Sequence, residues 1–184
     1  GGLIAINLKG SDEVVSASLI ANGDEILLVS RKGMSLRFIC DDESLRSMGR
    51  STSGVIGMKF RDGDELLTMS RVDGDNSFVF TATDGGYGKK TPIAEYRLQG
   101  RGGIGIKAAK IDEDSRGTLV AALVLIDSDE ILAITSAGTV MRTQASEIRQ
   151  TGRDSMGVRL LNLDEGATLL TVTRSREDEI SEEK

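Results

Sequence analysis

Arginine and glycine are concentrated in one nine-residue stretch of the chain, Arg97-Leu-Gln-Gly-Arg-Gly-Gly-Ile-Gly105. Glycine has no side chain, so a glycine-rich backbone can approach a phosphate closely. The two arginines add positive charge and forked hydrogen-bond donors. Successive backbone N–H groups in such a run can also form a concavity that binds an anion. The stretch is therefore a candidate phosphate-binding site.

Three interpretations of this stretch compete. Gly100, Gly102 and Gly105 satisfy the G-x-G-x-x-G pattern of dinucleotide-binding proteins, but that pattern requires a buried strand before it and a helix after it. Residues 94–97 form no apolar run, and residues 112–117 are typical of a turn. A kinase glycine loop is excluded because the chain has no histidine for the His-Arg-Asp motif. A loop whose glycines only satisfy backbone geometry and a site that contacts a nucleic-acid backbone remain open.

The composition favours a globular chain without a metal or cofactor. Of its 184 residues, 39% are hydrophobic, which is enough for a sizeable core. Aromatic residues make up only 3% and Trp is absent, which argues against stacking of single-stranded bases. Cys40 is the one cysteine and histidine is absent, so we expect no disulfide, no metal site and a reducing, cytoplasmic location. No run approaches the ~18 apolar residues of a membrane span, and we expect no small-molecule ligand.

The distribution of charge divides the chain into two parts. The net charge of −6 by itself disfavours a nucleic-acid partner. However, residues 175–184 contain five acids and two bases and no aromatic residue, as is typical of a solvated tail. We therefore predict a folded DNA-wrapping domain over residues 1–174 and an acidic disordered tail over residues 175–184.

The chain repeats itself with a period of about 52 residues. The motif R-x-x-G-R occurs three times, and two glycine markers recur with it: a turn glycine with a base four residues later, and a glycine inside a short alternating segment that ends on a base. The motif arginines are Arg46 and Arg50, Arg97 and Arg101, and Arg149 and Arg153; the glycines are Gly33, Gly86 and Gly138 in the turns and Gly57, Gly105 and Gly157 in the segments. Three markers in the same order at one period establish an internal repeat.

Each repeat is predicted to form about four short antiparallel strands, so the fold class is all-β. Apolar runs and alternating segments of strand type lie at residues 13–17, 25–29, 56–60, 65–69, 78–82, 118–126, 130–134 and 156–160. The turn glycines would join pairs of strands as hairpins, with positive φ. Four strands in about 50 residues is the period of a propeller blade. Because a single blade cannot bury its own face, about three and a half blades must stack here.

The repeated stretches resemble a known family, the C-terminal domains of DNA gyrase A and of its topoisomerase IV counterpart. Residues 99–105, Gln-Gly-Arg-Gly-Gly-Ile-Gly, are similar to the gyrase box Gln-Arg-Arg-Gly-Gly-Lys-Gly. The matching positions are Gln99, Arg101, Gly102, Gly103 and Gly105, whereas Gly100 and Ile104 replace basic residues. Residues 30–33, 84–91 and 152–157 are also similar to the family. We interpret residues 99–105 as a degenerate gyrase box, whose contribution to supercoiling is open.

The resemblance implies a β-pinwheel, a propeller-like ring of blades that exchange strands, with a basic rim that bends and wraps duplex DNA. It implies a role in negative supercoiling by a type IIA topoisomerase, together with the remainder of gyrase A and with gyrase B. The DNA-cleaving tyrosine of the family lies in another domain, so no catalytic centre is expected here. Tyr87 and Tyr96 are expected to be structural.

The candidate DNA contacts are arginine and lysine residues that recur at the same place in each repeat. Phosphate contacts position a duplex without reading its bases, and blade packing alone requires no cation at these places. The first group is the arginines of the motif, Arg46, Arg50, Arg97, Arg101, Arg149 and Arg153. The second group is Lys59, Lys107, Arg159, Arg37, Lys90 and Arg142. The alternative function is a propeller that docks another protein and binds no DNA, which the acidic balance would suit.

Overall fold

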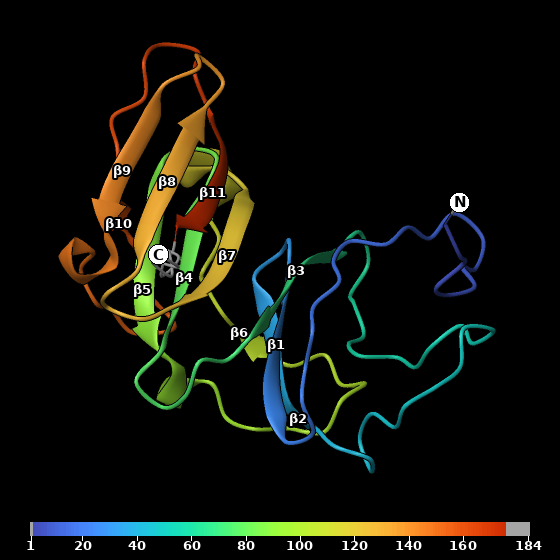
Figure 1. Ribbon diagram of the computed structural model, residues 1–184. Helices are drawn as coiled ribbons and strands as arrows, with labels where there is room; N and C mark the ends of the chain where they lie inside the picture. Colours follow the sequence, from blue (N-terminus) through green and yellow to red (C-terminus); the bar gives the residue numbers. More distant parts are fainter. Residues whose placement is uncertain (1, 176–184) are drawn as a thin grey trace, which may run out of the picture.

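The computed structural model describes residues 2–175, which consist mostly of β-strands and loops (Figure 1). The strands are β1 (Asp24–Ser30), β2 (Met34–Cys40), β3 (Leu66–Arg71), β4 (Phe78–Thr83), β5 (Tyr87–Pro92), β6 (Ile106–Lys107), β7 (Leu119–Leu125), β8 (Glu130–Thr135), β9 (Val140–Gln144), β10 (Val158–Arg159) and β11 (Leu169–Ser175). Two 3-10 turns, η1 (Ile93–Glu95) and η2 (Ala145–Glu147), directly follow β5 and β9, and one helical turn, α1 (Glu113–Arg116), precedes β7.

The strands form three antiparallel sheets, each built on one hairpin. We call them blade A (strand order β3-β1-β2-β6), blade B (β10-β5-β4-β7) and blade C (β11-β8-β9). In blades A and B a long strand from the next repeat pairs with the first hairpin strand, and a two-residue strand from the repeat after that pairs with the second. Ile106, for example, lies opposite Ser35. The all-β fold with antiparallel repeats of about 50 residues is confirmed, and the blades exchange strands.

Glycine sets the turn of each hairpin. Gly33, Gly86 and Gly138 have φ of 79°, 79° and 80°, a region that L side chains rarely adopt. In each turn the glycine N–H donates to the carbonyl three residues earlier, as Gly33 does to Ser30 at 3.0 Å. The prediction of equivalent hairpin turns with positive φ is confirmed.

The core lies between the blades, because each sheet presents alternate residues to opposite faces. Val79 and Phe80 are neighbours in β4 and both are fully buried. Val79 belongs to the cluster shared with Leu27 and Val29 of blade A, whereas Phe80 belongs to the cluster shared with Ile131 of blade C. Blade B is thus covered on both faces, which explains why β7 is a continuous apolar run and why residues 79–83 of β4 are all buried.

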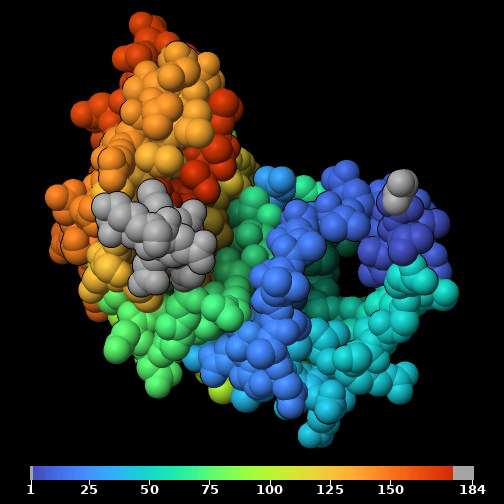
Figure 2. Space-filling model, viewed as in Figure 1, coloured from blue at the N-terminus to red at the C-terminus, as the bar shows by residue number. Residues whose placement is uncertain are grey.

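Two predicted strands are absent from the structure. Residues 13–17 and 56–60 form no strand, and only Val158–Arg159 (β10) forms within residues 156–160. In blades A and B, segments of these types pair with the hairpin of an earlier repeat. The described residues contain no hairpin before β1, so residues 13–17 and 56–60 find no strand to pair with. In Figure 2 the N-terminal residues (blue) and residues 41–60 (cyan) extend away from the sheets on the side opposite blade C.

The boundary predicted between residues 174 and 175 stays a prediction. Strand β11 continues to Ser175, whose backbone pairs with Glu130 in β8. The acidic tail predicted over residues 175–184 otherwise lies outside the described residues.

Candidate nucleic-acid interface

The second and third R-x-x-G-R turns are attached to hairpin strands of the blades. The second motif follows η1 and runs parallel to β2, where Leu98 pairs with Arg37 and the Gln99 N–H donates to the Arg37 carbonyl at 2.8 Å. The third follows η2 and lies in the same way along β5, where the Thr151 N–H donates to the Lys90 carbonyl at 2.9 Å. Two successive repeats therefore hold their arginine turns in equivalent places.

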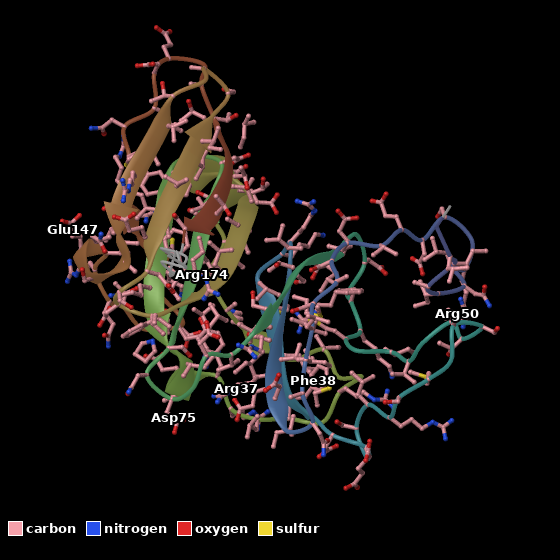
Figure 3. The ribbon with its side chains drawn as sticks, viewed as in Figure 1. Arg37, Phe38, Arg50, Asp75, Glu147 and Arg174 are labelled. Carbon is pink, nitrogen blue, oxygen red and sulfur yellow. The ribbon has the colours of Figure 1, made fainter. Side chains whose placement is uncertain are left out.

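The first arginine of every motif projects into solvent. Arg46, Arg97 and Arg149 are all exposed. Among the residues that the structure describes, none of the three forms a salt bridge or a side-chain hydrogen bond. Arg50 is exposed as well, on the extended segment after blade A (Figure 3). These guanidinium groups have all of their donors available for a ligand.

The second arginine of the later motifs has a different environment. Arg101 donates from Nε to the Ser44 carbonyl and from Nη1 to the Ile56 carbonyl at 3.0 Å. Arg153 donates from Nη1 to the Lys107 carbonyl at 2.7 Å. Both side chains are half-buried. They fasten each turn to the preceding repeat, so only part of their hydrogen-bonding capacity can reach a partner outside the protein.

The basic residues that follow the hairpin turns of blades A and B are buried, whereas residues on a DNA-binding rim were predicted to be exposed. Arg37 is 8% exposed, forms a salt bridge with Glu25, and donates from Nη1 to the Ile93 and Tyr96 carbonyls, both at 3.0 Å. Figure 3 places Arg37 within the body of the protein, far from Arg50. Arg37 thus donates to the 3-10 turn of the next repeat. The prediction that Arg37 lies on the basic rim therefore needs correction.

Lys90 takes the same role in blade B. It is 4% exposed, and its ammonium donates to the Ala145 carbonyl in η2 at 2.8 Å and to Asp127 at 2.7 Å. It also lies 4.5 Å above the ring of Phe78, which occupies the place of Glu25 in the repeat. Lys90 is therefore also removed from the rim. The third base of this set, Arg142, is exposed and forms a salt bridge with Glu130.

Glycine in the degenerate box serves mainly to bring two chain segments together. A Cβ on Gly105 would lie 2.0 Å from the Ser35 carbonyl oxygen, and φ there is 81°. Gly157 has the same role against the Gly88 carbonyl, at 2.5 Å. Gly100, in contrast, has nothing within 4 Å of its Cβ position. Backbone geometry thus explains Gly105, whereas Gly100 is free to be any residue as far as packing is concerned.

The segments that follow the arginine turns present a second row of basic residues, in β6, in β10 and in the irregular segment around residue 59. Lys59, Lys107 and Arg159 occupy equivalent positions and are all exposed. Arg159 donates to the Tyr87 hydroxyl at 2.8 Å, and its guanidinium lies 5.2 Å from the centre of the Tyr87 ring.

Sequence reasoning missed Arg116, which lies 4.7 Å from the same ring and donates to the Gly157 carbonyl at 2.9 Å. Arg116 belongs to α1, for which the other repeats have no equivalent among the described residues. The repeat pattern could therefore not reveal it.

Sequence reasoning also missed a cluster of charged side chains around Arg71 in β3 and Arg174 in β11. Arg174 in β11 donates to Asp73 at 2.7 Å and to the Val124 carbonyl at 2.8 Å, and lies 3.5 Å from Asp129 (Figure 3). Arg71 in β3 has the equivalent relation to Asp24, at 3.7 Å. The signal was available, because Arg71 and Arg174 pair with Ile26 and Ile131 at the same position of their blades. This cluster joins the blades, because Arg174 of blade C contacts Val124 of blade B and Asp73 beside β3 of blade A.

Within residues 2–175 no group of three or more His, Cys, Asp or Glu side chains could hold a metal ion. None of the helices described there is long and apolar enough to cross a membrane. The interface that remains is a set of exposed cations distributed over successive repeats.

The comparisons with known proteins agree on one family. The model of the family described as DNA gyrase C-terminal domain, beta-propeller, matches residues 1–21, 24–73, 77–125 and 129–176. DNA gyrase A of Streptomyces coelicolor is 55% identical over 182 residues, and that of Mycobacterium tuberculosis is 49% identical over 178 residues. These matches cover 96% and 97% of this chain but 21% of each relative. The chain thus spans about a fifth of the length of the relatives it matches.

Solved structures give the same result for the fold. A DNA gyrase A C-terminal domain superposes with a TM-score of 0.84 at 29% identity, over 94% of this chain and 58% of that one. The C-terminal domain of a DNA topoisomerase IV also gives a TM-score of 0.84, at 26% identity, over 92% of this chain and 52% of that one. The last three matched segments of the family model each begin at the hairpin of one blade. The chain therefore belongs to the family of DNA gyrase C-terminal β-propeller domains.

Proposed function

We propose that this chain binds, bends and wraps duplex DNA along the exposed cations of its arginine turns. The observation that supports the proposal most directly is the repeated environment of Arg46, Arg97 and Arg149. Each is exposed and has no carboxylate partner in the described part of the chain, although the protein as a whole is acidic. A fold that needed these arginines for packing would bury or pair them, as it does with Arg37 and Lys90.

Regular spacing of the cations suits a backbone-contacting mode of binding. Phosphate contacts fix the position of a duplex without reading its sequence. Arginines that meet a duplex at intervals along a curved surface hold it bent, as the histone octamer does. The scarcity of aromatic residues argues against a single-stranded partner. The blades would thus follow the backbone of a double helix.

The proposed contacts fall into two groups of different weight. Side chains of the principal group are exposed and donate to no carbonyl or carboxylate of the described residues. Side chains of the additional group already donate to such an acceptor. The principal group is Arg46, Arg50, Arg97, Arg149, Lys59, Lys107 and Arg159; the additional group is Arg101, Arg153, Arg116 and Arg142. Arg37 and Lys90 are left out because their charges are buried.

Membership of the gyrase C-terminal family supports a role for this DNA binding within a larger enzyme. We infer that the chain works with the remainder of gyrase A and with gyrase B in the bacterial cytoplasm, where wrapping would support negative supercoiling. The chain would contribute geometry rather than chemistry, with DNA cleavage carried out elsewhere in the enzyme. Gly100 and Ile104 leave the box with fewer cations than the family pattern, so the rim depends more heavily on the recurring first arginines.

A salt titration of duplex binding tests the proposal. Log K should fall linearly with log salt concentration, with a slope of about −0.9 for each phosphate contacted. The Arg97→Ala variant should reduce the magnitude of that slope by about one. Arg31→Ala removes the same charge from an arginine that pairs with Glu65 and belongs to neither group of proposed contacts, and should leave the slope nearly unchanged. A chain that binds no duplex at low salt would favour the protein-docking alternative.

A further inference from the structure

Lys89 is a buried cation beneath the third arginine turn. It lies in β5 and is only 1% exposed, although its side chain ends in an ionisable amine. Its ammonium donates to the Gly152 carbonyl at 3.2 Å and to the Arg153 carbonyl. Both carbonyls belong to the turn that follows Arg149. Lys89 thus supports from below a turn whose outer side presents an exposed arginine.

The other repeats indicate that the fold does not require this charge. The residue three positions after the turn glycine is Leu36 in blade A, Lys89 in blade B and Met141 in blade C. Leu36 is fully buried, and its Cβ lies 3.3 Å from the Cβ position of Gly105, just as the Lys89 Cβ lies 3.4 Å from that of Gly157. The same site beneath an arginine turn is therefore filled by an apolar side chain in blade A.

The charge of Lys89 is only partly compensated. Burial lowers the pKa of Lys89 to about 8, while the more distant Asp154 and Glu95 oppose this shift and Arg153 adds to it. No carboxylate in the described residues lies within salt-bridge distance of its ammonium. Burying a cation without a close counter-ion is costly, and an anion bound at the outer side of the turn would reduce that cost.

We propose that Lys89 is a positioning residue for DNA binding, whose ammonium holds the third arginine turn in shape and adds positive potential beneath the phosphate that Arg149 contacts. The proposal rests on the function proposed above. It names a residue that touches no DNA itself and acts through the Gly152 and Arg153 carbonyls.

Lys89 should make DNA binding depend on pH. The negative potential of DNA favours the ammonium form, so the complex keeps the Lys89 proton to a higher pH than the free protein does. Affinity should therefore be full below pH 8 and fall as the pH rises through 8, by up to about tenfold per pH unit. The chain has no histidine, and burial raises the pKa of Cys40. Few other side chains therefore titrate in this interval.

The test uses the full chain, a blunt duplex and the variant Lys89→Met, which places in blade B the residue type found in blade C. Between pH 7 and pH 9 the parent should lose about three- to tenfold in affinity, whereas Lys89→Met should bind more weakly at pH 7 and show a nearly flat profile. Lys110→Met removes an exposed lysine from the same chain and should keep the pH dependence. A Lys89→Met variant with the parent's affinity and profile would overturn the proposal.

Hydrogen exchange without DNA provides the second measurement. Amides of residues 151–157 should exchange faster in Lys89→Met than in the parent at pH 7, while amides of β8 should not change. Equal exchange in the turn would show that Lys89 does not hold it. If neither protein binds duplex at low salt, the proposed function fails and the DNA part of this inference fails with it, whereas the exchange result still decides whether Lys89 positions the turn.

Discussion

The two arginines of one motif have separable roles at the scale of single residues. Arg97 is exposed, whereas Arg101 donates to two carbonyls of the preceding repeat. Arg97→Ala should weaken DNA binding without changing thermal stability. Arg101→Ala should lower the free energy of unfolding by about 1–3 kcal/mol because it leaves those carbonyls without their donor. Thermal unfolding and salt-dependent binding, measured on both variants, check this; equal effects of the two substitutions on stability would contradict it.

Two glycines of the degenerate box offer a matched pair for stability. Gly105→Ala would force a Cβ to within 2.0 Å of the Ser35 carbonyl oxygen, at a φ of 81°. The resulting strain should cost at least ~1–3 kcal/mol. Gly100→Ala meets nothing within 4 Å and should stay within about 0.5 kcal/mol of the parent. Urea unfolding of the two variants separates them, and a Gly105→Ala protein as stable as Gly100→Ala would refute the packing argument.

At the scale of elements, the basic residue after the hairpin turn acts as a joint between blades in blades A and B. Arg37 connects β2 to η1 of the next repeat and is paired with Glu25, whereas Arg142 occupies the equivalent place in β9 but is exposed. Arg37→Ala should destabilise the protein by on the order of 3 kcal/mol, because it leaves Glu25 and two carbonyls without a partner. Arg142→Ala should cost about 0–1 kcal/mol. Urea unfolding midpoints at unchanged m check the difference; similar losses would mean that the joint contributes little.

Much of the hairpin structure was predictable from the sequence, whereas the exchange of strands was not. Apolar runs and turn glycines indicate where a hairpin forms, and Gly33, Gly86 and Gly138 have the expected positive φ. The strands that complete each sheet pair with the hairpin across one or two repeats. The local sequence pattern does not indicate these partners. For the same reason residues 13–17 have strand character in sequence but no partner in the structure.

The candidate site was predictable only as a set of recurring charges. Recurrence alone does not distinguish a basic residue that contacts DNA from one that joins two blades, because residues of both kinds recur from one blade to the next. Burial separates them: Arg97 faces solvent, while Arg37 and Lys90 are buried against carbonyl oxygens. The residue twelve positions earlier does not separate them, because an acid precedes both the buried Arg37 (Glu25) and the exposed Arg142 (Glu130).

At the scale of the whole molecule, the first arginines should act together on the shape of the DNA. Bending a stiff duplex costs several kcal/mol, which no single phosphate contact can offset. We therefore expect that replacing Arg46, Arg97 and Arg149 with Ala together abolishes bending, while each single substitution only lowers the magnitude of the salt slope by about one. The triple variant should still bind duplex weakly through Lys59, Lys107 and Arg159.

The measurement is the end-to-end distance of a duplex labelled at both ends, with and without the protein, together with the linking-number change after ligation. A triple variant of Arg31, Lys32 and Arg71 is the matched control, because it removes the same charge from residues outside both groups of proposed contacts. Arg31 and Arg71 already pair with carboxylates, and Lys32 donates to the Asp62 carbonyl. The control should shorten the end-to-end distance as the parent does. If the first-arginine triple variant also shortens it, the arginine turns are not the wrapping surface and the DNA path must lie over another face of the blades.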